Sequence, residues 1–263
     1  MPCPIFVVDA FSNAAFSGNP AGVCLLSEPA EEAWMQSVAA EMKHAETAFV
    51  WAQSEGVYGL RWFTPTVEVA LCGHATLASA HVLWSTSCLP TTEPITFQTL
   101  HSGELVCRQT EGRIEMDFPS EEMVGAPCPE GLAEALETDL LWIGLNRMDY
   151  LVELASESEV RQLRPNLELL AEIPVRGVIV TAQGTNYDFV SRFFAPACGV
   201  PEDPVTGSAH CALGPFWADR LGKSRLQGYQ ASPRGGEVGV EVMDNRVLLL
   251  GSARTVLEGK LLA

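Results

Sequence analysis

The chain has 263 residues, enough for one large domain or two of ordinary size, and long enough to bury a core without disulfides or a structural metal. Its 33 acidic and 16 basic residues give a formal net charge of −17, which argues against binding nucleic acid or an anionic membrane through bulk electrostatics. The first residues lack the features of a signal peptide, no apolar run reaches the length of a membrane span, and eight scattered cysteines suit a reducing compartment. We therefore expect a cytoplasmic protein that contacts no membrane.

Short runs rich in Val, Ile, Phe and Tyr, bounded by turn residues, predict many strands. They cover residues 5–11, 21–26, 47–52, 58–63, 104–109 and 113–118, and then 150–155, 177–182, 187–194, 236–242 and 246–251. Helical periodicity occurs near 30–43, 74–87 and 130–137, between 156 and 172, and over 207–221. Because strands do not alternate regularly with helices, the pattern favours an α+β fold over a doubly wound sheet.

The two halves of the chain contain a repeat. The segment "RWFTPTVEVALCGHATLASAHVLW" (61–84) resembles "RFFAPACGVPEDPVTGSAHCALGPFW" (192–217), and each predicts a strand, a loop and a helix of small residues. Aligned at Gly73 and Gly207, the two segments match His74 with Ser208. This repeat, with the poorly patterned segment 119–130 between its copies, predicts half-domains over residues 1–120 and 121–252.

A glycine at a helix start leaves backbone N–H groups unpaired at the positive end of the helix dipole, where anions bind. Gly73 and Gly207 would each begin such a site, with the hydroxyl of Ser208 beside the second, although ordinary tight turns fit the same pattern. Asp203 and Thr206 precede the second helix. They fit N-terminal capping as well as a carboxylate that faces the anion site.

Glu46, in "KHAETAFVW", lies where a helical pattern gives way to an apolar strand. A carboxylate in apolar surroundings has a raised pKa and can carry protons near neutral pH, although the pattern alone favours a solvated glutamate at a strand edge. Cys72, in register with Thr206, fits either a buried thiol or one activated by the helix N-terminus. His74 alone fits an interior histidine, and "SGNPAG" around Asn19 predicts a turn. The spacing of cysteines and histidines matches no zinc template, so we predict no metal site.

In combination, "DAFSNAAFSGNPAGVCLL", "ETAFVW", "LRWFTPTVEVALCGHATLASA", "EDPVTGSAHCAL" and "TVLEGKL" resemble the PhzF-type phenazine biosynthesis family, and above all its eukaryotic phenazine biosynthesis-like domain, or MAWD-binding, branch. The resemblance runs from Phe6 to Leu262. It implies the diaminopimelate epimerase fold, in which two pseudo-symmetric half-domains, each a curled mixed sheet around a central helix, enclose the active site. It also implies that residues 253–263 complete the first half-domain and that the protein is a homodimer.

The resemblance further implies an isomerase that uses neither a metal nor an organic cofactor. Glu46 would move a proton between carbons of a small carboxylate-bearing substrate, which is a dihydro-anthranilate in the family's phenazine enzyme. His74 and Asp203 would orient and polarise the substrate. The residues implied to bind it are Asn19, Gly73, Gly207 and Ser208. One carboxylate that acts first as base and then as acid implies transfer on a single face of the substrate.

Two features depart from the family pattern, and a third departs from the epimerases of the same fold. Lys43-His44-Ala45 replaces the common Asn-Leu-Ser before the glutamate and adds cationic character, and Pro215 predicts that the helix after Ser208 kinks or restarts. Epimerases of this fold use two cysteines; Cys72 resembles the first, but the "EDPVTG" loop has none. Two alternatives to the isomerase are therefore a racemase or epimerase that uses Cys72, and a protein that retains the fold to bind a partner such as a WD-repeat protein.

Overall fold

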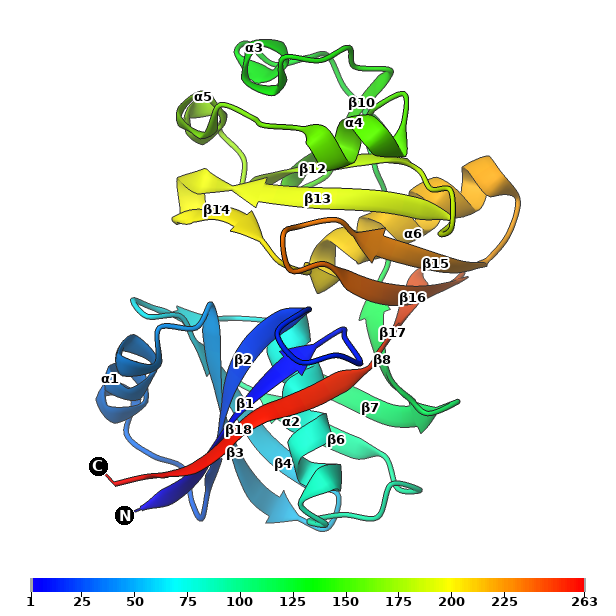
Figure 1. Cartoon of the computed structure of the whole chain (residues 1–263). Coiled ribbons are helices and arrows are strands. Elements are labelled where there is room, and N and C mark those ends of the chain that lie inside the picture. The colour runs from blue at the N-terminus through cyan, green and yellow to red at the C-terminus, as the bar shows by residue number, and fades with distance from the viewer. Residues whose placement is uncertain (1, 263) are drawn as a thin grey trace. The chain divides into compact units, whose positions relative to one another are not determined.

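The computed structural model describes residues 2–262, and the chain divides into two compact units (Figure 1). Unit 1 comprises residues 1–117 and 250–263, and unit 2 comprises residues 118–249. Each unit combines a mixed β-sheet with a few helices, which confirms the predicted α+β class.

Unit 1 contains most of the N-terminal elements and the last strand of the chain. In order they are β1 (Cys3–Ala10), β2 (Asn19–Leu26), α1 (Glu32–Met42), β3 (Glu46–Ser54), β4 (Val57–Phe63), β5 (Glu68–Val69), α2 (Gly73–Ser85), β6 (Ile95–Thr99), β7 (Glu104–Thr110) and β18 (Ala253–Leu261). Two strands, β8 (Arg113–Pro119) and β17 (Arg246–Gly251), run from one unit into the other.

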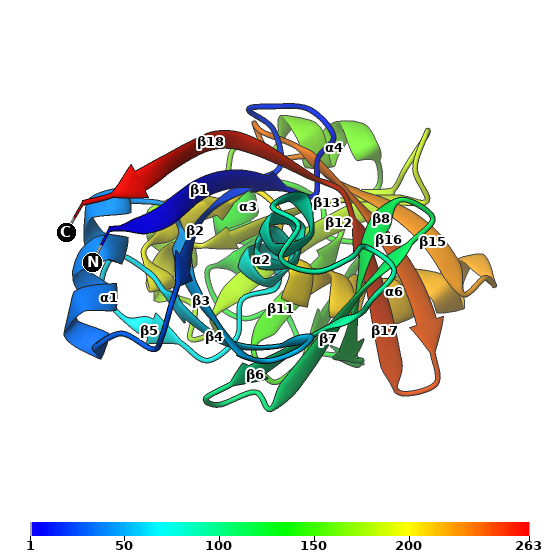
Figure 2. The same ribbon diagram turned by 90° about the horizontal axis from the view of Figure 1, so that it is seen from below.

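The sheet of unit 1 surrounds α2. β2 is parallel to β3, β3 antiparallel to β4, β4 parallel to β6, and β6 antiparallel to β7. β1 is antiparallel to both β2 and β18. Ten of the thirteen residues of α2 are buried, as expected for a helix that is apolar on all sides, and Figures 1 and 2 show the strands of the unit around it. α1 packs outside this layer, with Met35 and Val38 in a cluster that includes Phe49.

Unit 2 begins with β9 (Val124–Gly125) and α3 (Leu132–Leu136). Its further elements are β10 (Trp142–Leu145), β11 (Asp149–Glu153), α4 (Glu157–Gln162), α5 (Leu167–Glu172), β12 (Gly177–Gln183), β13 (Phe189–Ala195), the 3₁₀ turn η1 (Pro196–Cys198), β14 (Val200–Asp203), α6 (Gly207–Leu221), β15 (Arg225–Gln230) and β16 (Gly236–Met243).

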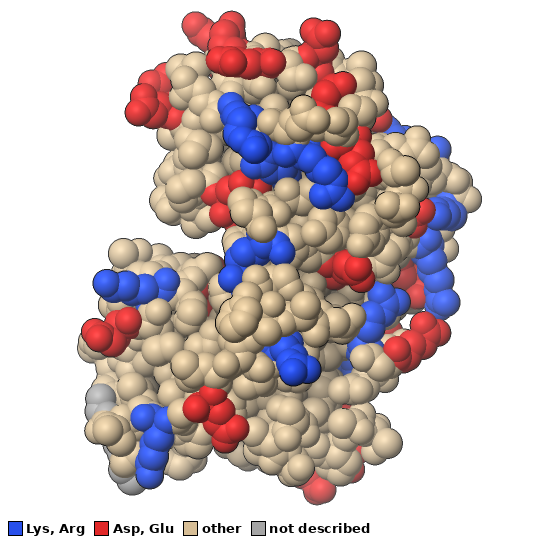
Figure 3. All heavy atoms as spheres, in the orientation of Figure 1, with Lys and Arg blue, Asp and Glu red and all other residues tan. Residues whose placement is uncertain are grey.

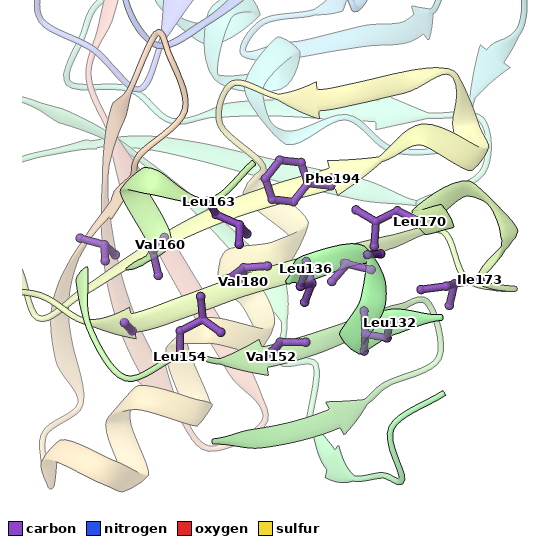
Figure 4. Packing of buried hydrophobic residues seen from close by; sticks show 14 residues of the cluster. Leu132, Leu136, Val152, Leu154, Val160, Leu163, Leu170, Ile173, Val180 and Phe194 are labelled. Atoms are coloured by element: carbon purple, nitrogen blue, oxygen red, sulfur yellow. The ribbon is translucent and has the colours of Figure 1, made fainter. Parts of the chain in front are cut away.

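The strand pairing of unit 2 repeats that of unit 1. β11 is parallel to β12, β12 antiparallel to β13, β13 parallel to β15, and β15 antiparallel to β16. α6 packs against β15 and β16, while α4 and α5 pack on β12 and β13. The three short helices and these strands share a cluster of buried aliphatic side chains, including Leu136, Val152 and Val180 (Figure 4). The repeated segments thus occupy equivalent places in two sheets of the same topology.

Several strands were not predicted from the sequence. β6, β10, β14 and β15 are short, and β14 and β15 read "VPED" and "RLQGYQ", with few apolar residues. β6 and β15 are each paired on both sides, with one parallel and one antiparallel neighbour. Their conformation therefore depends on tertiary pairing more than on local sequence.

Acidic and basic side chains are interspersed on the face of the molecule drawn in Figure 3. Within residues 2–262, none of the helices has both the length and the apolar character needed to cross a membrane.

The prediction that the second central helix restarts at Pro215 is wrong, because α6 continues from Gly207 to Leu221 through this residue. A proline has no N–H to donate to the carbonyl four residues earlier, which here is that of Cys211. This carbonyl instead accepts a hydrogen bond of 3.1 Å from the backbone N–H of Glu121. A segment outside the helix therefore replaces the hydrogen bond that the proline removes.

Gly214 allows α6 to approach the sheet closely. A Cβ atom at this position would lie 2.6 Å from Cγ1 of Val240 and 3.4 Å from Cγ2 of Val242. Val240 is buried and branched at Cβ, so its side chain has little freedom to move away. The residue at position 214 must therefore be a glycine because there is no room for a Cβ atom, and not because of its backbone conformation.

We predict that Gly214→Ala lowers the free energy of unfolding by about 1–3 kcal/mol, because the added methyl group overpacks the contact between α6 and β16. Urea unfolding would measure the change. In a double-mutant cycle, Val240→Ala should offset part of the cost, so the double variant should be more stable than the sum of the single changes. Strict additivity would contradict this account.

His210 lies in the first turns of α6 and is completely buried. Its Nδ1–H donates a hydrogen bond of 2.8 Å to the carbonyl of Thr206, and its ring packs at a tilt against Phe189. Burial lowers the pKa of His210 to about 4, although the hydrogen bond to Thr206 acts in the opposite direction. The imidazole is therefore neutral in the folded protein at physiological pH.

This neutral histidine predicts a loss of stability in mild acid. An unfolded histidine binds a proton near pH 6.5, whereas folded His210 does so only near pH 4, so the unfolded state binds more protons as the pH falls below about 6.5. Between pH 7 and pH 5 the contribution of His210 should fall by about 2 kcal/mol. Urea unfolding of His210→Gln should be less pH-dependent than that of the wild type by this amount. An equal pH dependence would contradict the prediction.

Candidate functional site

The predicted proton carrier lies beside a buried imidazole in unit 1. Glu46 is the first residue of β3 and pairs in register with Ala21 of β2. His74 is in the first turn of α2. Glu46 Oε2 lies 3.2 Å from His74 Nε2, and the side chains are 20% and 7% exposed, respectively. A carboxylate that solvent can still reach is thus in contact with an imidazole that solvent scarcely touches.

Burial fixes the charge of this imidazole. Desolvation, together with the nearby His44, lowers the pKa of His74 to about 3, so the ring is neutral at physiological pH. Asn19, at the buried start of β2, places its Nδ2 3.3 Å from His74 Nδ1. An amide nitrogen can only donate, so Nδ1 accepts and the ring proton is on Nε2, the nitrogen that contacts Glu46 Oε2. The orientation of the Asn19 amide therefore decides which nitrogen of His74 carries the proton beside the carboxylate.

Cys72 lies next to the same imidazole. Its Sγ is 3.5 Å from His74 Nδ1 and 4.0 Å from Nε2. Cys72 is the N-cap residue of α2, but its thiol makes no capping hydrogen bond, and its carbonyl accepts one of 2.6 Å from the hydroxyl of Thr76. Glu46, Cys72 and His74 each offer a ligand-type atom, and these atoms lie within 4.8 Å of one another. Spacing of cysteine and histidine in the sequence does not reveal this group, because Glu46 comes from a distant strand.

In unit 2, Asp203 and Thr206 interact with each other. The hydroxyl of Thr206, the N-cap residue of α6, donates to Asp203 Oδ2 at 2.5 Å and makes no capping hydrogen bond to the helix. The Nε2 of buried Gln230 donates to the carbonyl of Asp203, and its Oε1 accepts from the backbone N–H of Thr206. The Asp203 side chain is thus oriented by a hydroxyl at the helix start.

Ser208, in the first turn of α6, accepts a hydrogen bond from Arg176, a residue that the sequence did not indicate as part of a site. Arg176 Nη1 donates to Ser208 Oγ at 3.0 Å. The same guanidinium donates through Nε and Nη2 to both carboxylate oxygens of Asp149, which is 1% exposed. Arg176 also lies over the ring of Phe193. In the sequence, Arg176 is seen only as an arginine one residue before the apolar strand β12, and Asp149 only as the first residue of the strand β11. Neither position indicates that the two side chains interact.

The structure groups the predicted site residues by unit. Unit 1 brings together Asn19, Glu46, Cys72, Gly73 and His74. Unit 2 brings together Asp203, Thr206, Gly207 and Ser208, and adds Gln230 and Arg176 to them.

The whole chain is similar to known proteins. Residues 8–259 match the PhzC-PhzF family, described as phenazine biosynthesis-like protein. An uncharacterized isomerase of Halalkalibacterium halodurans is 51% identical over all of this chain and 99% of its own length. A phenazine biosynthesis-like domain-containing protein of Rattus norvegicus is 42% identical, and the alignment covers both chains completely.

Solved structures show the same fold. The crystal structure of a PhzF-family phenazine biosynthesis protein of Enterococcus faecalis superposes with a TM-score of 0.96, at 40% identity over all of both chains. A hydroxyproline epimerase of Agrobacterium vitis superposes with a TM-score of 0.66 over 99% of this chain and 92% of its own, and at 10% identity this likeness concerns the fold alone. The predicted epimerase-like fold is confirmed, and the chain belongs to the PhzC-PhzF, phenazine biosynthesis-like, family.

Proposed function

We propose that this protein is an isomerase that moves a proton within a small carboxylate-bearing substrate, with Glu46 as acid and base and with no metal or organic cofactor in the reaction. The observation that carries the proposal is the contact between Glu46 Oε2 and His74 Nε2. A general base needs a defined position and a route to the substrate, and the partly exposed Glu46 combines both. Several relatives of the chain, including that of Halalkalibacterium halodurans, are named isomerases.

Glu46 would take a proton from one carbon of the substrate, while the electron pair of the broken C–H bond moves into a conjugated system. The same carboxyl group would then return the proton to another carbon, so no oxidant or reductant is needed. Throughout this exchange His74 stays neutral beside Glu46 Oε2, because its low pKa prevents it from taking up a second proton. The transferred proton would therefore be held by the Glu46 carboxyl group and not by the imidazole.

The first turn of α6 in unit 2 offers donors for an anionic group. An arginine can only donate, so the oxygen of Ser208 accepts from Arg176 and its own O–H is available for another acceptor. The helix N-terminus adds its positive partial charge at the same place. Asp203, oriented by Thr206, would bind a cationic or hydroxyl group. This combination supports a substrate with a carboxylate and at least one further polar group.

A cytoplasmic location stays a prediction of the composition, and a homodimer and a WD-repeat partner stay predictions of the family resemblance.

The main test uses exchange of substrate hydrogen with solvent deuterium. The protein would be incubated in D₂O with a panel of small carboxylic acids that carry an activated C–H bond, including dihydro-aromatic acids, and products analysed by mass spectrometry. We expect the wild type to incorporate deuterium into at least one acid. Glu46→Gln should slow incorporation by about 10²–10⁴-fold, because an amide preserves the shape of the side chain but cannot carry the proton.

Two further variants define the outcome of this test. Glu55→Gln changes an exposed glutamate beyond the end of β3 and should have no effect, and Cys72→Ala should retain exchange. Loss of exchange in Cys72→Ala, with exchange preserved in Glu46→Gln, would replace the carboxylate mechanism by a thiol mechanism. A wild type that exchanges no acid but binds a protein partner would favour retention of the fold for binding.

A further inference from the structure

We infer that Glu46, Cys72 and His74 form a binding site for a zinc ion, and that zinc at this site inhibits the isomerase. The binding part of this inference stands on the three side chains alone. The inhibition part rests on the proposed function, since it requires that Glu46 carry the proton.

The distances among the three side chains fit one small cation. Glu46 Oε2 and His74 Nε2 are 3.2 Å apart, His74 Nε2 and Cys72 Sγ are 4.0 Å apart, and all three ligand atoms lie within 4.8 Å. A tetrahedral zinc ion, with bonds of about 2.0 Å to nitrogen and oxygen and about 2.3 Å to sulfur, separates its ligand atoms by roughly 3.3–3.7 Å. Cys72 Sγ is 3.5 Å from Nδ1, so its side chain must rotate from the Nδ1 side of the ring toward the lone pair of Nε2 to complete the site.

The types of ligand select the metal. A thiolate, an imidazole and a carboxylate are the three ligand classes that zinc uses, whereas magnesium and calcium prefer oxygen atoms alone. Cys72 and His74 are both buried and lie two residues apart at the start of α2, which keeps the thiol next to the imidazole. Three protein ligands leave the fourth position of a tetrahedral ion for water or for an anion.

Zinc binding would reverse the direction of the hydrogen bond between Asn19 and His74. Coordination requires the lone pair of Nε2, so the ring proton moves to Nδ1. The amide of Asn19 would rotate to present its oxygen to Nδ1–H, which is the usual partner of a metal-bound histidine. The thiol proton of Cys72 passes to solvent when the sulfur binds. The ion therefore takes the carboxylate that proton transfer needs, together with the imidazole nitrogen beside it.

Binding can be measured without any turnover. The full chain, stripped of metal with a chelator and then desalted, would be titrated with Co²⁺, whose thiolate charge-transfer band reports a cobalt–sulfur bond, and with Zn²⁺ in competition with a chromophoric chelator. We expect one zinc ion per chain. Cys72→Ala should abolish the charge-transfer band, and Cys72→Ser and Glu46→Gln should weaken zinc binding by more than the about 10–100-fold that loss of an outer partner costs. Asn19→Ala should show that smaller effect.

Other thiols of unit 1 provide matched controls. Cys24 is buried and interacts with Cys3, and Cys88 is exposed, so Cys24→Ala and Cys88→Ala remove one thiol each without touching Glu46 or His74. Both variants should bind zinc like the wild type. Circular dichroism would show that each variant is folded. Unchanged zinc affinity in folded Cys72→Ala and Cys72→Ser, or loss of affinity in the control variants, would overturn the site.

The inhibition is tested in the deuterium-exchange assay. Zinc should inhibit exchange by the wild type and a chelator should restore it, whereas exchange by Cys72→Ala should respond far less to zinc. Zinc bound through Cys72 without any effect on exchange would overturn the inhibition. If no acid in the panel exchanges but cobalt binds through Cys72, the proposed function fails and the metal site stands.

Discussion

The position of the His74 ring proton is the constraint on which the chemistry of unit 1 depends. Because the ring is buried, its pKa is about 3 and it has one proton to place at physiological pH. Asn19 on one side and Glu46 on the other decide where that proton lies, since an amide N–H requires an acceptor and a carboxylate requires a donor. A charged imidazole would donate from both nitrogens, and its Nδ1–H would then face the N–H of the Asn19 amide. The neighbours therefore require the neutral ring that burial provides.

The fold brings these groups together from three places in the chain. Asn19 begins β2 and Glu46 begins β3, and the parallel pairing of the two strands places their first residues at the same edge of the sheet. α2 then packs against both strands, with His74 in its first turn. The parallel pairing requires a crossover connection, which α1 supplies. The active groups are therefore presented by strand and helix starts, whose positions are set by the core and not by a loop.

Local sequence predicted much of this arrangement. Periodicity indicated α1, α2 and α6 and most of the longer strands, because their apolar residues recur with the period of the element. The change from helix to strand at Glu46 was visible for the same reason. Contacts between distant segments were not visible. The hydrogen bond from Glu121 that lets α6 continue through Pro215, and the guanidinium of Arg176 that orients Ser208, each join elements that no spacing rule connects.

The close grouping of Glu46, Cys72 and His74 suits two kinds of chemistry. A carboxylate held 3.2 Å from a neutral imidazole suits the transfer of a proton, and with a thiol added it also suits a zinc ion. The two uses need opposite tautomers of His74, so they exclude each other, and the adjustable amide of Asn19 is compatible with both. Cys72 is the residue that separates them, since proton transfer by Glu46 does not require a thiol and zinc binding does. A thiol that lacks the second cysteine of the epimerases of this fold thus has a physical role in the metal affinity of the site.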